Sequence, residues 1–178
     1  MTRIRWVVAI VFAVVTSLGV VMVISLGNSS QGTPPSQLIG HVPPSFTLTA
    51  FDGSALRLDD YAGKVVIVNW WNEWCQPCID ETPSLLQVAA DLKNDPNVAM
   101  IGIVHDERTQ RAARDYAAST GIPYPLAFDP GGRTALDWGV SQQPETFIIA
   151  PNGKVQAWIP GPIDVARTES IVASLEQR

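Results

Sequence analysis

The sequence predicts an α/β domain, with a central mixed sheet, helices on both faces and an extra N-terminal β-hairpin, preceded by one transmembrane helix. Three observations support this prediction. Apolar runs of strand length alternate with segments whose apolar residues recur at helical spacing, as in a sheet covered by helices. Two short alternating segments flank a turn ahead of the first apolar run. An uncharged apolar stretch of 21 residues, from Trp6 to Leu26, comes before all of them.

The N-terminal stretch is long enough to cross a bilayer, because about 20 apolar residues in a helix span the hydrocarbon core. Arg3 and Arg5 precede the stretch, and no further basic residue follows until Arg57. The positive-inside rule therefore places residues 1–5 in the cytoplasm and everything after the helix outside it. We expect a signal-anchor helix over residues 6–27 in the cell (inner) membrane. The alternative is a cleaved signal peptide, whose apolar region is shorter, at about 7 to 15 residues.

The composition of the remaining chain predicts its domain boundaries and argues against some functions. Residues 28–44 are rich in Ser, Gly and Pro, which predicts a tether, and the folded domain is expected over residues 45–178. A formal net charge of -5 argues against nucleic-acid binding, and 46% hydrophobic residues argue against disorder. A domain of this size needs no disulfide framework, so its two cysteines require another explanation.

The first half of the predicted domain is a hairpin, a buried strand and a helix. Residues 46–49 and 56–58 alternate in the strand period on either side of the turn Asp52-Gly53. Residues 64–71 form a continuous apolar run, which suits a strand covered on both faces. Residues 77–93 then carry apolar side chains at helical spacing, until an Asn-Asp-Pro sequence ends the helix.

The second half repeats the alternation of strand and helix. A buried strand is expected at residues 98–104, followed by a helix over 107–120 that a glycine closes. Right-handed crossovers between parallel strands place the end of each such strand beside the start of the helix that follows it. The remaining predicted elements are a short strand at 125–128, a short helix at 133–138, a hairpin of strands 146–149 and 155–159, and a closing helix at 165–176.

The cysteines stand at the first of these strand-to-helix junctions. Cys75 is expected at the helix N-terminus, where unpaired N–H groups and the helix dipole favour an anion, so it is the predicted attacking thiolate. Cys78 follows one turn later, close enough to form a disulfide with Cys75 but more shielded, which suits a resolving thiol. Pro77, between them, is suited to the first turn of a helix.

Three other interpretations of the pair are a structural disulfide, half of a zinc site and two unrelated buried thiols. A loop of three residues restrains the unfolded chain very little, so a structural disulfide there contributes less than a long-range one. Zinc needs further ligands, and the two histidines of the chain are His41, in the tether, and His105, at a strand end. We therefore favour a redox-active Cys75–Cys78 pair, and predict neither a metal nor any other cofactor.

Several motifs follow in a fixed order along the domain: GKVVIVNWW over residues 63–71, WCQPC over 74–78, Glu81 and Pro83 in the pattern C-x-x-C-x-x-E-x-P, and VSQQPETFII over 140–149. From Gly40 to the C-terminus the chain thereby resembles the thioredoxin-like family, and specifically its membrane-anchored TlpA, ResA and CcmG branch. The peroxiredoxin pattern P-x-x-x-T-x-x-C is absent. Copper chaperones of the Sco type are disfavoured, because they use C-x-x-x-C with a distal histidine.

The resemblance implies a role for Glu81 and for the residues around the cis-proline. Thioredoxin keeps a buried aspartate on the strand before its active site, where this chain has Asn69, so Glu81 is the expected replacement for proton transfer. A carboxylate near the cysteines is expected to raise their pKa values. The alternative is a first-turn glutamate that favours only the helix dipole. Six residues are expected to bind substrate: Trp74, Gln76, Pro77, Gln143, Pro144 as the cis-proline, and Glu145.

The resemblance also implies an activity. The expected enzyme is a membrane-anchored, extracytoplasmic thiol-disulfide oxidoreductase that reduces the C-x-x-C-H disulfide of an apocytochrome c during cytochrome c maturation. Its electrons are expected from a membrane protein of the CcdA or DsbD kind, because no reducing pool exists outside the cytoplasm. One alternative is a non-catalytic assembly factor that holds apocytochrome or haem-delivery proteins. The other is a thiol oxidase that inserts disulfides.

Overall fold

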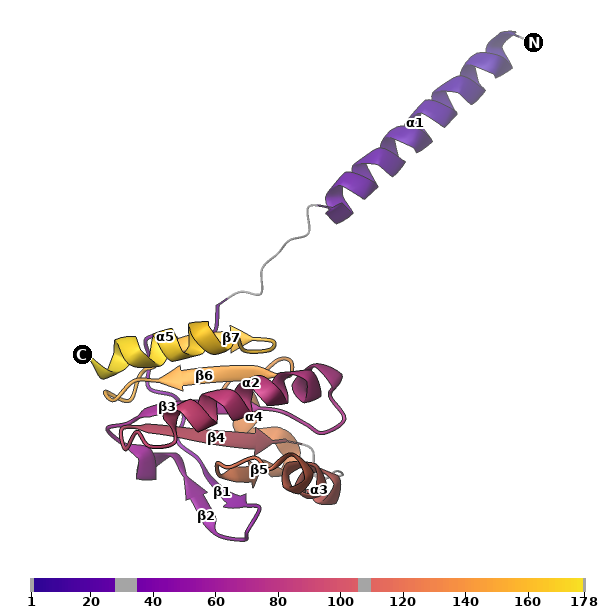
Figure 1. Ribbon diagram of the computed structural model, residues 1–178. Helices are drawn as coiled ribbons and strands as arrows, with labels where there is room; N and C mark the ends of the chain where they lie inside the picture. The colour runs from indigo at the N-terminus through magenta and orange to yellow at the C-terminus, as the bar shows by residue number, and fades with distance from the viewer. Residues whose placement is uncertain (1, 28–34, 106–109, 178) are drawn as a thin grey trace. The chain divides into compact units, whose positions relative to one another are not determined.

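A computed structural model describes residues 2–27, 35–105 and 110–177 (Figure 1). The chain divides into two compact units, Met1–Pro34 and Pro35–Arg178. The first part of the predicted tether, residues 28–34, lies outside the described residues.

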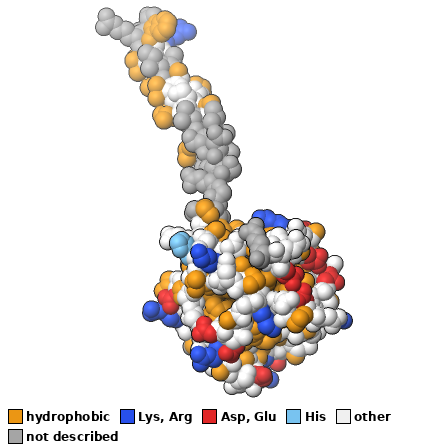
Figure 2. Space-filling model, turned by 90° about the vertical axis from the view of Figure 1, so that its left-hand side faces the viewer, with side chains coloured by type: hydrophobic (Ala, Val, Ile, Leu, Met, Phe, Trp, Pro, Cys, Tyr) orange, Lys and Arg blue, Asp and Glu red, His pale blue; other side chains and the backbone are white. Residues whose placement is uncertain are grey.

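The first unit contains helix α1, over Thr2–Gly27. Its described large apolar side chains are exposed, and Figure 2 shows them along the helix. Among the residues whose placement is described, no helix has the length and apolar character that crossing a membrane requires. The transmembrane span predicted for residues 6–27 is therefore not confirmed.

The second unit contains a seven-stranded mixed sheet, with the strand order β2-β1-β5-β4-β3-β6-β7. Strands β3, β4 and β5 run parallel, and the remaining pairs are antiparallel. The strands are β1 (Thr47–Ala50), β2 (Ala55–Arg57), β3 (Val65–Trp70), β4 (Val98–Val104), β5 (Leu126–Phe128), β6 (Glu145–Ile149) and β7 (Val155–Pro160). The predicted α/β fold with a mixed sheet is confirmed, and β1 with β2 forms an N-terminal hairpin.

Helices cover both faces of this sheet (Figure 1). The helices are α2 (Gln76–Leu92), α3 (Gln110–Thr120), α4 (Arg133–Asp137) and α5 (Val165–Glu176), with short 3-10 turns at Leu58–Tyr61 and Pro130–Gly132. On one face, α2 and α5 pack on Val65 and Ile67 of β3, and α3 packs against the end of β4. On the other face, α4 and the N-terminal hairpin pack against Val66 and Val68 of β3.

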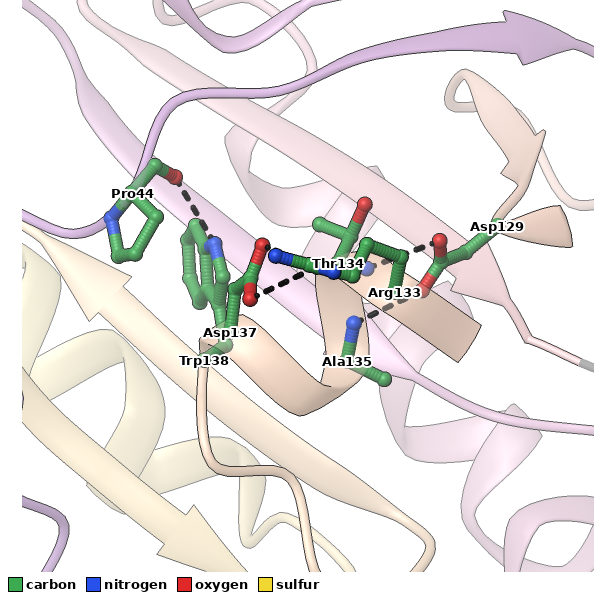
Figure 3. Close-up of polar contacts among 7 residues, drawn as sticks. All are labelled: Pro44, Asp129, Arg133, Thr134, Ala135, Asp137 and Trp138. Carbon is green, nitrogen blue, oxygen red and sulfur yellow. Dashed lines mark hydrogen bonds and ion pairs between the residues drawn. The ribbon is translucent and has the colours of Figure 1, made fainter. Parts of the chain in front are cut away.

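The folded unit includes part of the segment that was predicted as a tether. Ile39 pairs with Val155 of β7, where Gly40 N donates to the Val155 carbonyl at 2.8 Å and Val155 N donates to the His41 carbonyl at 2.9 Å. Further along, the Pro44 carbonyl accepts a hydrogen bond from the indole N–H of Trp138 at 2.9 Å (Figure 3). The expected domain start at residue 45 is thus too late, because the edge strand β7 offers free backbone groups that this segment uses.

Asp129 fixes the start of α4, the helix that precedes residues 140–143. Its buried carboxylate accepts hydrogen bonds from Thr134 N at 3.0 Å and from Ala135 N at 2.7 Å (Figure 3). These are two of the N–H groups that a helix N-terminus leaves without an intrahelical partner. After α4 the chain turns back, and Val140 N donates to the Ala135 carbonyl at 2.9 Å. The segment that follows Val140 is thereby placed beside the cysteines.

Candidate active site

The two cysteines lie where β3 passes into α2, as the sequence predicts. Cys75 is the N-cap of α2, and its sulfur accepts a hydrogen bond from Cys78 N at 3.3 Å. The two sulfurs form a disulfide, and the Cα atoms are 5.2 Å apart. An N–H group aimed at the Cys75 sulfur and the positive end of the helix dipole both stabilise a thiolate at that position.

The two sulfurs have different surroundings. Cys75 lines a groove between the active-site turn at residues 74–77 and the segment at residues 140–143, with His105 beside them. Cys75 is 7% exposed and Cys78 is 2% exposed, and both pack in the apolar cluster beneath α3, but Cys78 does not line the groove. The groove therefore gives a partner molecule access to Cys75, whereas Cys78 is reached through Cys75.

The Gln143–Pro144 peptide bond at the edge of this groove is cis. Pro144 directly precedes β6, and its carbonyl accepts a hydrogen bond from Gly161 N at 2.8 Å. Gln143 lines the groove, and its side-chain Oε1 accepts a hydrogen bond from Asn72 Nδ2 at 2.7 Å. The segment before the cis-proline is thus connected to the turn that carries Cys75.

Glu81 lies on α2, one turn after Cys78, and is 2% exposed. Its Oε1 accepts a hydrogen bond from Ile163 N at 2.7 Å, and its Oε2 accepts a longer one from Asn69 Nδ2 at 3.4 Å. Burial raises the pKa of Glu81 from an ordinary value of 4.5 to about 7, against the opposing effect of these two hydrogen bonds. A carboxyl group with such a pKa can exchange a proton near neutral pH.

Tyrosine hydroxyls belong to the same buried region. Burial is the main cause that raises the pKa of Tyr124, followed by the charges of Glu81 and Tyr116. The Tyr116 hydroxyl forms a hydrogen bond with the Thr82 hydroxyl at 2.8 Å, and the latter donates to the Cys78 carbonyl at 3.0 Å. The helix turn around Cys78 is therefore held by polar contacts from α3.

Glu145 does not occupy the substrate-binding position that the sequence predicts. It is fully buried, and its Oε1 accepts hydrogen bonds from Ser141 N, the Ser141 hydroxyl and Gln142 N at 3.1 to 3.2 Å. Its Oε2 accepts a hydrogen bond from the indole N–H of Trp158 at 3.2 Å. The Glu145 carboxylate thus fixes residues 141–142 of the groove from the buried side, and both of its oxygens already accept hydrogen bonds within the protein.

Of the other predicted substrate-binding residues, Trp74, Gln76, Pro77 and Gln143 line the groove, whereas Pro144 is buried directly behind Gln143 in the sequence. Trp74 is 59% exposed, unlike the buried Trp70 and Trp71 that precede it. Gln76 and Pro77 are exposed on the same wall, and Gln76 Nε2 donates to the Asp80 carboxylate at 2.8 Å. An exposed indole thus lies in the groove that Cys75 also lines.

Comparison with known proteins assigns the family. The model of the AhpC/TSA family matches residues 39–158. The chain belongs to this family. A thiol-disulfide oxidoreductase ResA of Bacillus thuringiensis subsp. konkukian is 33% identical over 123 residues, which are 69% of this chain and 70% of that protein. A thiol:disulfide interchange protein HelX of Rhodobacter capsulatus is 35% identical over 151 residues, which are 83% and 80% of the two chains.

Solved structures agree with this assignment. A thiol:disulfide interchange protein of the thioredoxin family from Chlorobium tepidum is 28% identical, with a TM-score of 0.66, and the match covers 80% of this chain and 97% of that one. The predicted resemblance to the thioredoxin-like ResA and CcmG branch is confirmed, and the chain is a thiol-disulfide oxidoreductase.

The sequence did not predict four of the residues that line the groove, although three of them belong to the motif at residues 140–149. Val140, Ser141 and Gln142 line the groove, and so does His105, which the sequence analysis considered only as a zinc ligand. Among the described residues, no group of three or more His, Cys, Asp or Glu side chains could hold a metal ion. The position of His105 directly after the buried strand β4 could have indicated the groove, because β3 and β4 are parallel and end at the same edge of the sheet.

Proposed function

We propose that this oxidoreductase reduces disulfides in partner proteins, with Cys75 as the nucleophile and Cys78 as the resolving thiol. The observation that carries the proposal is the difference between the two sulfurs, since Cys75 lines the groove and caps α2 while Cys78 lies behind it. The Cys75 thiolate attacks one sulfur of the partner disulfide, forms a mixed disulfide and releases the first partner thiolate. The Cys78 thiolate then attacks Cys75, closes the Cys75–Cys78 bond and releases the second. Two electrons pass to the partner.

Glu81 is proposed as the general base that accepts the proton of the Cys78 thiol. The Cys78 thiol must lose its proton before it can attack, and a carboxyl group with a pKa of about 7 can accept that proton at neutral pH. Glu81 lies one helical turn after Cys78, on the same helix. The negative charge of ionised Glu81 also disfavours a second negative charge nearby, and so raises the pKa of the neighbouring thiols.

The partner chain is proposed to lie in the groove between the Cys75 turn and the cis-proline segment. Trp74, Gln76 and Pro77 form one wall, while Gln143, directly before the cis-proline Pro144, forms the edge of the other. Trp74 offers an exposed ring, and Gln143, directly before Pro144, is proposed to offer its backbone groups to an extended chain.

The proposed substrate is the oxidised C-x-x-C-H segment of an apocytochrome c, during cytochrome c maturation outside the cytoplasm. The relationship to ResA, HelX and DsbE proteins supports this choice. An oxidised enzyme in that compartment has no thiol pool to reduce it, so we propose a membrane electron donor of the CcdA or DsbD kind. Membrane attachment is proposed on the sequence alone, from the uncharged stretch between Trp6 and Leu26.

The direction of electron flow is tested by the reduction potential of the full-length protein, equilibrated with defined thiol and disulfide buffers. For a two-electron couple, about 30 mV corresponds to 1.4 kcal/mol, so the method separates the alternatives. We expect a potential below about -200 mV, as for a reductant. A potential near -120 mV would identify an oxidase that inserts disulfides and would contradict the proposed direction.

The catalytic role of the cysteines is tested by trapping. In Cys78→Ser the mixed disulfide between Cys75 and the partner cannot be resolved, so we expect partner proteins to be recovered in disulfide-linked form. Cys75→Ser is the matched control and should trap none. Partners that co-purify with both variants without a disulfide link would favour the non-catalytic assembly factor.

Membrane attachment is tested separately, by washing cell membranes at alkaline pH. The full-length chain is expected to remain in the membrane pellet. Recovery in the soluble fraction would contradict the anchor and leave the redox proposal intact.

A further inference from the structure

We infer that Asn72 is a positioning residue for substrate binding, which holds Gln143 on the far wall of the groove against the turn that carries Cys75. The inference rests on the proposed function, because it assigns a task to a side chain that supports the proposed binding groove. Asn72 is fully buried and does not line the groove, whereas Gln143 does. Asn72 therefore acts on a partner chain only through Gln143.

The register of the sheet explains why these two side chains meet. In the antiparallel pair of β3 and β6, Trp70 lies opposite Glu145. Continued by two residues, this register places Asn72 opposite Gln143. The backbone ladder ends at Trp70 and Glu145, because Pro144 has no N–H to donate. A side-chain hydrogen bond, from Asn72 Nδ2 to Gln143 Oε1 at 2.7 Å, joins the two segments where the ladder has ended.

Asn72 is itself attached to the active-site turn. Cys75 N donates to the Asn72 carbonyl at 3.2 Å, so the residue that holds Gln143 also contacts the nucleophile's backbone. Among the described residues, Asn72 Oδ1 and Gln143 Nε2 have no hydrogen-bond partner. If both side-chain amides are reversed, these two atoms can form the bond instead, so the connection does not depend on one assignment of the amide atoms.

The groove segment is held at its other end by Glu145, which accepts hydrogen bonds from Ser141 and Gln142. Loss of the Asn72 bond therefore leaves the backbone at residues 141–142 in place and frees Gln143. A partner chain then has to order Gln143 when it binds, which weakens binding. The chemical step at Cys75 is unchanged, because Asn72 does not contact either sulfur through its side chain.

The test uses full-length, pre-reduced enzyme and an oxidised synthetic peptide with the sequence Cys-Ala-Ala-Cys-His, mixed in a stopped-flow fluorimeter. Single-turnover rates at increasing peptide concentration give a half-saturating concentration and a limiting rate. For Asn72→Ala we expect the half-saturating concentration to rise roughly three- to tenfold, the range for one buried hydrogen bond. The limiting rate and the equilibrium constant with glutathione should change by less than about twofold. Asn94→Ala, at an exposed position beyond the other end of α2, is the matched control and should match the wild type.

A double-mutant cycle with Gln143→Met isolates the bond. If the two side chains act as one unit, the double variant N72A/Q143M is no worse than the weaker-binding single variant. If the increases in half-saturating concentration caused by N72A and Q143M multiply in the double variant, the inference is overturned. It is also overturned if the limiting rate or the glutathione equilibrium changes together with the half-saturating concentration.

Two further outcomes are informative. If N72A does not fold, Gln143→Glu keeps an acceptor for Asn72 Nδ2 and should weaken peptide binding less than Q143M does, whereas equal losses would overturn the inference. Wild-type enzyme that reacts with glutathione but not with the peptide would contradict the proposed substrate, and this inference with it.

Discussion

Glu81 and Glu145 are both buried in the folded domain, yet their carboxylates meet very different sets of donors. Glu145 accepts four hydrogen bonds, from Ser141 N, the Ser141 hydroxyl, Gln142 N and the Trp158 indole. Glu81 accepts two, and the one from Asn69 is long, at 3.4 Å. Burial outweighs these two bonds and raises the pKa of Glu81 to about 7. The same residue type thus serves as a fixed acceptor at one position and as a proton-exchanging group at the other.

The positions of the two glutamates match this difference. Glu81 lies on α2, one turn from Cys78, where a proton is gained or lost during the proposed reaction. Glu145 opens β6 directly after the cis-proline, where the groove segment needs a fixed shape. A buried carboxylate with few hydrogen-bond donors costs free energy when it ionises. Such groups cluster at functional sites, where their proton takes part in the reaction.

The largest effect is expected when the fixed acceptor is removed. Glu145→Met leaves four donors without their acceptor, and should lower the free energy of unfolding by about 3 to 5 kcal/mol. Urea unfolding measures it, with Gln177→Met at the exposed C-cap of α5 as the control, expected to change stability by less than about 0.5 kcal/mol. A loss as small as that of the control would show that these hydrogen bonds do not hold the segment.

Glu81→Gln should instead show a stability effect that depends on pH. The folded state raises the pKa of Glu81 from 4.5 to about 7, so it favours the protonated form. The stability that this proton contributes is fully present below pH 4.5 and is lost as the pH rises to about 7. Since one pKa unit corresponds to 1.36 kcal/mol, the wild type should lose about 3 kcal/mol relative to E81Q over this interval.

Urea unfolding of the oxidised wild type and E81Q at pH 4.5, 6 and 8 measures this difference. The comparison between the two variants cancels the other carboxylates, which titrate in both proteins. If the difference in unfolding free energy between the wild type and E81Q does not change with pH, the folded state does not favour the protonated form of Glu81. The contrast between the two glutamates would then be wrong.

The sequence predicts much of this arrangement, because the signals are local. The apolar run before Cys75 defines β3, and the spacing of apolar residues after it defines α2, so the cysteine pair falls at their junction. The resemblance identifies Pro144 as the family's cis-proline, and the Gln143–Pro144 bond in the structure is cis.

Other contacts depend on residues far apart in the sequence and leave no local signal. Gly40 pairs with the edge strand β7 through its backbone, which the composition of a Ser- and Pro-rich segment does not reveal. All five residues of β6 are buried, so the alternation of the strand does not show that Glu145 points inward. The bond between Asn72 and Gln143 arises only after β3 and β6 pair in their observed register.

A smaller effect should distinguish the two glutamates at the reactive sulfur itself. Above pH 7 the Glu81 carboxylate is charged and disfavours a thiolate at Cys78, one helical turn away, and over a longer distance at Cys75, so its replacement by glutamine should lower the pKa of both active-site thiols. At pH 8 the reduced E81Q enzyme should react with iodoacetamide at Cys75 roughly three- to tenfold faster than the wild type. Below pH 6, where Glu81 is protonated in the wild type, the two rates should converge.

Glu145→Gln is the matched comparison, since it makes the same Glu-to-Gln change at a buried position directly after the cis-proline. Its alkylation rate should stay within about twofold of the wild type at both pH values, because the Glu145 carboxylate faces Ser141, Gln142 and Trp158. Peptide mapping by mass spectrometry assigns the modified cysteine. Equal acceleration in both variants would mean that buried negative charge acts on the sulfurs without regard to position, and the assignment of separate tasks to the two glutamates would then be wrong.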